Sequence, residues 1–215
     1  NFVLDDFDRY EFPDSPKIKR KVSKNKIDKN WFFIAHVNFT LESKYRNIPV
    51  IDGVKKSVEY LISNGWELSA ATDRVNSFKR SNIKHYMNKL ILKDSKIIEK
   101  LENLIVEDTL VWYASNFDPK YFPQKNIMFC NGQSKAESCH GLGSRILIED
   151  DYSNAVKNAN FIDPLTQRRN HYSILINMPY NQGSLVENMI RINEPTKEKT
   201  YEKVVDLLEK LSKIY

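Results

Sequence analysis

The stretch IPVIDGVKKSVEYLISNGWELSAATDR, residues 48–74, decides the fold because it combines a helix with a buried strand. Its first half places apolar residues at helical spacing on one face: Val54, Val58, Leu61 and Ile62. Gly65 follows at the position where a residue in the left-handed conformation commonly closes a helix. The short apolar run 66–72 comes next and is typical of a buried strand.

A second apolar run precedes this stretch. WFFIAHV, residues 31–37, consists largely of aromatic and β-branched residues, which favour a buried strand. Strand, helix and strand in that order form the βαβ unit of a parallel sheet. The sequence therefore predicts that residues 31–72 begin a parallel α/β fold.

The rest of the chain continues the alternation. Three further apolar runs predict strands at 126–130, 144–151 and 172–179. Residues 77–105 have a helical pattern with a break near 93–95, and 196–215 form an amphipathic helix. One face of that last helix carries Val204, Leu207, Leu208 and Leu211. We therefore expect one domain over residues 31–215, a doubly wound parallel sheet with helices on both faces.

Residues 1–30 form a separate unit in this interpretation, a basic N-terminal arm. The net charge of the chain is +5, and residues 17–30 alone hold seven Lys or Arg and one Asp, so the remainder is nearly neutral. Such a run can contact nucleic-acid phosphates, an acidic partner protein, or only solvent. The residues expected to make that contact are Lys17, Lys19, Arg20, Lys21 and Lys24.

The amino-acid composition limits the cellular compartments in which we expect the protein. Two cysteines, Cys130 and Cys139, form neither a disulfide framework nor a metal set, which suits a reducing environment. No apolar run reaches the roughly 18 residues that a membrane span needs, and no secretory signal is visible. We expect the cytoplasm, or the host cytoplasm for a viral protein. An organellar matrix stays open, because the chain begins with Asn1 and a leader can have been removed.

Polar residues follow the predicted strands. The carboxyl end of the first strand provides His36, Asn38 and Thr40, and that of the second provides Thr72 and Asp73. Lys135 follows the third strand, and the fourth ends in the acidic pair Asp150 and Asp151. Ligands of open α/β sheets bind at the carboxyl ends of the strands, so these side chains are expected to meet in one site.

This order resembles the haloacid dehalogenase (HAD) superfamily of phosphotransferases over roughly residues 31–181. The family pattern is Asp-x-Asp-x-Thr, then Ser or Thr, then Lys, then an acidic pair, each after a parallel strand. The segments ILIEDDYSNA, ILINMPYNQG and IRIN are similar to the 5′(3′)-deoxyribonucleotidase and 5′-nucleotidase-like branch. The resemblance implies a HAD-like Rossmannoid domain with little or no cap.

The resemblance also assigns roles. Thr72, Asp73 and Lys135 would hold the phosphoryl group, and the acidic pair Asp150 and Asp151 would bind Mg²⁺. His36 stands at the position of the nucleophile, and Asn38 at that of the general acid and base. An amide cannot transfer the proton, and losing both carboxylates removes the covalent step and one metal ligand. We therefore expect a catalytically degenerate domain, without need of Mg²⁺, that acts as a binding or structural component of a larger assembly.

Two other hypotheses remain open. In one, Asp6 and Asp8 are the true Asp-x-Asp, 9–47 form a small cap, and the protein is an active Mg²⁺-dependent 5′-nucleotidase or phosphatase acting on nucleoside monophosphates. In the other, the pocket binds a nucleotide without hydrolysing it. The alternative interpretation of the strand-end residues is structural: Thr72 caps the following helix, Asp150 and Asp151 form an N-cap for the helix that begins with YSNAVKN, and Lys135 is solvated.

Overall fold

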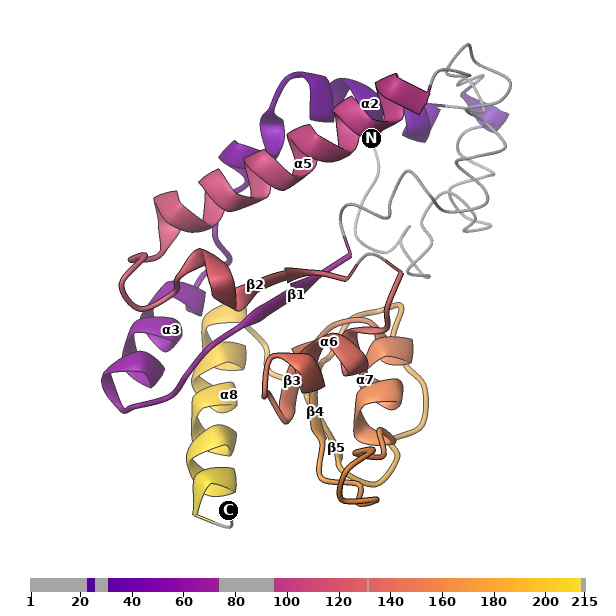
Figure 1. Ribbon diagram of the computed structural model, residues 1–215. Helices are drawn as coiled ribbons and strands as arrows, with labels where there is room; N and C mark the ends of the chain where they lie inside the picture. Colours follow the sequence, from indigo (N-terminus) through magenta and orange to yellow (C-terminus); the bar gives the residue numbers. More distant parts are fainter. Residues whose placement is uncertain (1–22, 26–30, 74–94, 131, 214–215) are drawn as a thin grey trace.

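The computed structural model describes residues 23–25, 31–73, 95–130 and 132–213, and within them the chain is a mixed α/β structure (Figure 1). The strands are β1 Ala70–Thr72, β2 Ile127–Phe129, β3 Ile146–Glu149, β4 Tyr172–Ile176 and β5 Met189–Ile192. The α-helices are α2 Trp31–Leu41, α3 Val54–Ser63, α5 Ser95–Asn116, α6 Lys135–Gly141, α7 Tyr152–Ala159 and α8 Lys197–Ser212. The described chain also contains two short 3-10 helices, η3 Lys44–Asn47 and η5 Gln124–Asn126.

The strands form two small parallel sheets. β1 pairs with β2, and β4 lies between β3 and β5. Ile148 of β3 is in register with Ile174 of β4, which is in register with Ile190 of β5. The described strands thus confirm a parallel α/β structure, but they do not join into one doubly wound sheet.

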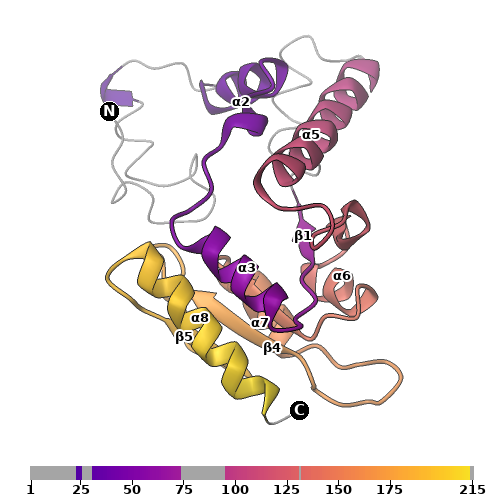
Figure 2. The same ribbon diagram turned by 90° about the vertical axis from the view of Figure 1, so that its left-hand side faces the viewer.

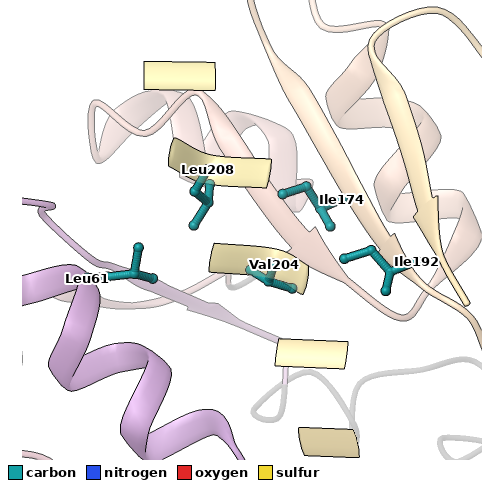
Figure 3. Close-up of a cluster of buried hydrophobic side chains, with 5 residues drawn as sticks. All are labelled: Leu61, Ile174, Ile192, Val204 and Leu208. Carbon is teal, nitrogen blue, oxygen red and sulfur yellow. The ribbon is translucent and has the colours of Figure 1, made fainter. Parts of the chain in front are cut away.

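Helices cover both faces of the three-stranded sheet. On one face, Ile174 and Ile192 pack against Leu61 of α3 and against Val204 and Leu208 of α8 (Figure 3). On the other face, Leu175 and Met189 pack against α7 through its two buried alanines, Ala155 and Ala159. The two helices α3 and α8 lie side by side (Figure 2). Burial of these apolar side chains is the main force that holds this part together.

A second core lies at the other end of the molecule. Leu101 and Ile105 of α5 are fully buried, and Val37 of α2 and Phe129 of β2 pack against them. Both views place α2 and α5 together, far from α8 (Figures 1 and 2). No helix in the described part of the chain has the length and apolarity needed to cross a membrane.

Several sequence predictions are confirmed. α3 ends as expected, with Gly65 at a φ of +83° directly after the C-cap Asn64. The predicted strands at 66–72, 126–130, 144–151 and 172–179 are present as β1 to β4, with β1 shorter than expected. α8 buries Val204, Leu208 and Leu211 on its inner face. α5 begins at Ser95, at the predicted break, while the predicted helix before it lies outside the described residues.

The strand predicted at 31–37 is wrong in this structure, because Trp31–Leu41 form the helix α2. A short, wholly apolar run has no periodicity that separates a strand from a helix, so packing decides. Here α2 packs Val37 onto the core of α5, and the Thr40 hydroxyl donates to the carbonyl of His36. The predicted βαβ unit therefore lacks its first strand.

Candidate functional site

Polar residues lie at the carboxyl ends of β1, β2 and β3. A buried ion pair lies at the centre: Lys135 Nζ is 2.6 Å from Glu149 Oε2. Lys135 is the first residue of α6, and Glu149 is the last residue of β3. Their side chains are 16% and 4% exposed, so the pair is largely removed from water.

The position of Lys135 is set by the start of α6. Ser134 caps this helix: its side chain accepts from the Glu137 backbone N–H, and the Glu137 carboxylate accepts from the Ser134 N–H at 2.8 Å. This capping box fixes the first turn. Lys135 therefore projects from a defined backbone toward the end of β3.

Glu149 is held on both oxygens. Its Oε1 accepts hydrogen bonds from the backbone N–H groups of Asp150 and Asp151 at 3.3 and 3.1 Å, while its Oε2 accepts one from Lys135 Nζ. Burial raises the pKa of Glu149, and the positive charge and hydrogen bond of Lys135 oppose that rise. Sequence reasoning missed Glu149; its signal was an acid inside the apolar strand ILIE.

Asp150 is supported by the segment after β4. Tyr180 donates to Asp150 Oδ2 at 2.5 Å, and Asn181 Nδ2 donates to the backbone carbonyls of Asp150 and Ile176 at 2.8 and 2.7 Å. Arg191 of β5 donates in turn to the carbonyl of Asn181 at 2.6 Å. The segments PYN, residues 179–181, and IRIN, residues 190–193, therefore hold the end of β3 in place through hydrogen bonds. The sequence did not predict this role.

Asp151 has a structural role. Its Oδ1 accepts from the backbone N–H of Asn154 at 2.9 Å, which makes it the N-cap of α7. The structural interpretation of Asp151 is thus confirmed, and its neighbour Asp150 takes no part in the cap. Among the described residues, no group of three or more His, Cys, Asp or Glu side chains is placed to hold a metal ion.

Two of the predicted residues, Thr72 and Asp73, lie beside a buried thiol. The Thr72 carbonyl accepts from the Cys130 N–H at 2.9 Å, which extends the pairing of β1 with β2. Burial raises the pKa of the Cys130 thiol, and the charge of Asp73 adds to this rise while that of Lys135 opposes it. The charges of Asp73 and Lys135 thus act on one thiol. We call Asp73, Cys130, Lys135, Glu149 and Asp150 the strand-end cluster.

His36 and Asn38 are not part of this cluster. Both lie on α2, where His36 Nε2 is 3.0 Å from the Tyr45 hydroxyl and Asn38 is exposed. Burial lowers the pKa of His36. In this arrangement the two residues do not stand at the end of a strand.

A cavity of about 1220 Å³ extends from the cluster between the two sheets. Its lining includes the polar residues Lys135, Glu149 and Asp150, and Ala70 and Ala71 of β1. Aromatic residues line it as well: Trp66, Trp112, Tyr113, Phe117 and Phe122. Of the α2 side chains that the structure describes, none lines it.

Comparisons with known proteins give no relative: no protein-family model, no curated protein and no solved structure matches the chain. The resemblance to the HAD superfamily therefore stays a prediction that rests on the order of the motifs.

Proposed function

We infer that this chain is a HAD-like α/β domain that binds a ligand or partner at the strand-end cluster without hydrolysing phosphate esters. One observation carries the proposal, the buried pair of Lys135 and Glu149 at 2.6 Å. A lysine that must stabilise phosphoryl oxygens needs charge to offer, and here a buried carboxylate already neutralises it. The domain would then serve as a binding component of a larger assembly.

The acids beside the pair support the same conclusion. An acidic pair that binds Mg²⁺ must offer carboxylate oxygens to the metal ion. The Asp150 carboxylate receives the Tyr180 hydroxyl, and the Asp151 carboxylate caps α7. Each is committed to a protein partner, so these described acids hold the sheet end together.

The test is phosphate release with Mg²⁺ from a panel of nucleoside monophosphates and a generic aryl phosphate. We expect no release above buffer from the wild type. A thermal shift with one of the same nucleotides, reduced in Lys135→Met and unchanged in Lys157→Met, would identify the cluster as the binding site. Enzyme-like turnover that disappears in Asp150→Asn would overturn the proposal.

The second candidate is an active Mg²⁺-dependent nucleotidase that uses Asp6 and Asp8. His36 lies on α2, outside the strand-end cluster, so the lack of a carboxylate at position 36 does not argue against catalysis at the cluster. This placement favours the second candidate. Asp6 and Asp8 lie outside the described residues. This candidate requires that Asp6→Ala abolish phosphate release while His36→Ala leaves it intact.

A further inference from the structure

The loop that joins α7 to β4 (Figure 1), residues 160–171, exposes apolar side chains. Leu165 is 89% exposed, more than any other large hydrophobic residue in the described part of the chain, and Ile162 is 50% exposed. β3, β4 and β5 are parallel and the loop leads into the first residue of β4, so it lies at the amino ends of these strands. The loop is therefore at the opposite end of the sheet from the strand-end cluster.

Asp163 holds the tip of this loop in one conformation. Its Oδ1 accepts hydrogen bonds from the backbone N–H groups of Leu165 and Thr166 at 2.8 and 3.3 Å. Its backbone N–H donates to the Arg168 carbonyl at 3.0 Å, and its carbonyl accepts from the Gln167 N–H at 2.8 Å. A side chain on a preformed loop loses little conformational freedom when it binds, so Leu165 is already positioned as a contact residue.

The base of the loop is fixed to the rest of the domain. The Phe161 ring packs against the rings of His140 and His171, with centroids 5.1 and 4.7 Å away. His171 is only 1% exposed. Asn188 Nδ2 donates to the Arg169 carbonyl at 3.4 Å, which joins the loop to the segment before β5. The loop therefore projects from a rigid base, as binding loops commonly do.

The exposed charges of the loop are positive. Arg168 and Arg169 are exposed, and among the described residues neither takes part in an ion pair. The acid of the loop, Asp163, is only 7% exposed, and its carboxylate accepts from N–H groups of the loop itself. Arg145 adds an exposed positive charge at the base, where its carbonyl accepts from the Tyr172 N–H at 2.7 Å. A surface complementary to this loop therefore carries carboxylates around an apolar pocket.

We propose that residues 160–171 form a docking loop for an acidic protein surface. Leu165 would fill an apolar pocket of the partner, and Arg168 and Arg169 would face carboxylates at the rim of that pocket. Protein interfaces have this anatomy, with an apolar core, a polar rim and an enrichment of arginine. The docking loop is separate from the strand-end cluster, so the proposal does not depend on what that cluster binds.

A protein fits this loop better than a nucleic acid or a membrane does. Single-stranded nucleic acids stack on exposed aromatic rings, and the Phe161 ring of the loop is packed against two histidines. Membrane binding grows with the apolar area that is buried, and the large apolar side chains exposed here are Ile162 and Leu165 alone. One such anchor suffices for a protein pocket, because a few central residues supply most of the binding energy of an interface.

Peptides selected on the full chain test the proposal. A random peptide library displayed on phage is first passed over immobilised Leu165→Ser, and the unbound phage are then selected on the wild type. We expect the enriched peptides to carry Asp or Glu beside a large apolar residue, and to bind Leu165→Ser at least about tenfold more weakly in fluorescence polarisation. Leu41→Ser, which replaces a leucine 53% exposed on α2, is the matched control and should bind as the wild type does. No enriched peptide, or peptides without acidic residues, would overturn the proposal.

The two arginines are tested through their charge. Arg168→Gln with Arg169→Gln should weaken peptide binding severalfold and reduce its dependence on salt, because salt screens charges at the rim of an interface. Lys55→Gln with Lys56→Gln, an adjacent exposed pair on α3, is the control for net charge and should change neither quantity. Circular dichroism of every variant should match the wild type, since each replaced side chain is exposed. Equal effects of the two double variants would show general charge attraction and refute the docking loop.

Other occupants of the loop are measured with the same variants. Cosedimentation with vesicles of equal parts phosphatidylcholine and phosphatidylserine detects a membrane, titration with polyuridylate detects RNA, and sedimentation velocity of the chain alone detects a second copy. We expect none of these signals to depend on Leu165 or on the arginine pair. A signal that Leu165→Ser or the arginine double variant abolishes would assign the loop to that occupant and overturn the proposal.

Discussion

Replacing Lys135 by Met should destabilise the domain by about 3 kcal/mol at pH 7.5. The substitution preserves most of the side-chain volume but removes the charge that faces Glu149, whose side chain is only 4% exposed. Removing one partner of a buried ion pair costs about 3–5 kcal/mol, because the other charge is left uncompensated. We take the lower end because Lys135 is 16% exposed and lines a cavity into which water can enter.

The cost should depend on pH in a definite direction. Burial raises the pKa of Glu149, and Lys135 opposes that rise, so the Met variant raises this pKa further. A carboxyl group whose pKa is higher in the folded than in the unfolded protein binds more protons in the folded state. The free energy of unfolding therefore falls as the pH rises from the ordinary Glu pKa of about 4.3 through the pKa in the folded protein. The deficit of the variant should therefore be small near pH 4 and grow toward pH 8.

Urea denaturation of four proteins measures this. Beside the wild type and Lys135→Met, the double variant Lys135→Met/Glu149→Gln should recover to within about 1 kcal/mol of the wild type, because neither charge of the pair remains. Lys157→Met on the exposed face of α7 is the control and should change stability by less than about 0.5 kcal/mol. A Lys135→Met variant as stable as this control, at every pH, would refute the buried pair.

Three further outcomes are expected. Asp151→Ala should lower the free energy of unfolding by about 1 kcal/mol in thermal denaturation, because it removes the N-cap of α7. Asp151→Asn should retain most of the stability, since Asn also caps helices. Equal losses in the two variants would show that the carboxylate has another role. Arg46→Met should lower the midpoint of urea denaturation, because it leaves the fully buried Asp108 without the guanidinium 2.5 Å away. The exposed control Lys125→Met should leave the midpoint unchanged. Neutralising the basic arm should flatten the salt dependence of RNA binding by about 0.7 per lost phosphate contact; an unchanged slope would exclude the arm as the contact. The residues to replace there are Lys17, Lys19, Arg20, Lys21 and Lys24.

The sequence predicted the elements whose pattern has a clear period. α3 and α8 carry apolar residues at helical spacing between recognisable ends, and both are present. Strand β5 was missed because MIRI has only four residues, with Arg191 among them and Asn188 before them, which is too short for a strand pattern to show. α6 was missed because a seven-residue helix shows little more than its cap, and here Ser134 and Glu137 were the only signal.

The sequence predicted the location of the site in outline, but not the contacts between its side chains. Placement after parallel strands brought Asp73, Lys135 and Asp150 to one end of the sheets, which chain order alone can forecast. The partner of Lys135 could not be forecast, because Glu149 comes from the last position of a strand whose inward direction is fixed only by the register with β4. Contacts between side chains far apart in sequence depend on that register, and a single sequence does not contain it.

The segment 31–37 is where sequence and structure disagree, and the disagreement concerns function as much as fold. On α2, His36 lies within hydrogen-bond distance of the Tyr45 hydroxyl, and burial lowers its pKa. The residue type at position 36 therefore carries no information about the chemistry of the strand-end cluster. A short apolar run has no period that separates a strand from a helix, so the packing of Val37 onto the core of α5 decides in favour of the helix. A single sequence does not contain that contact.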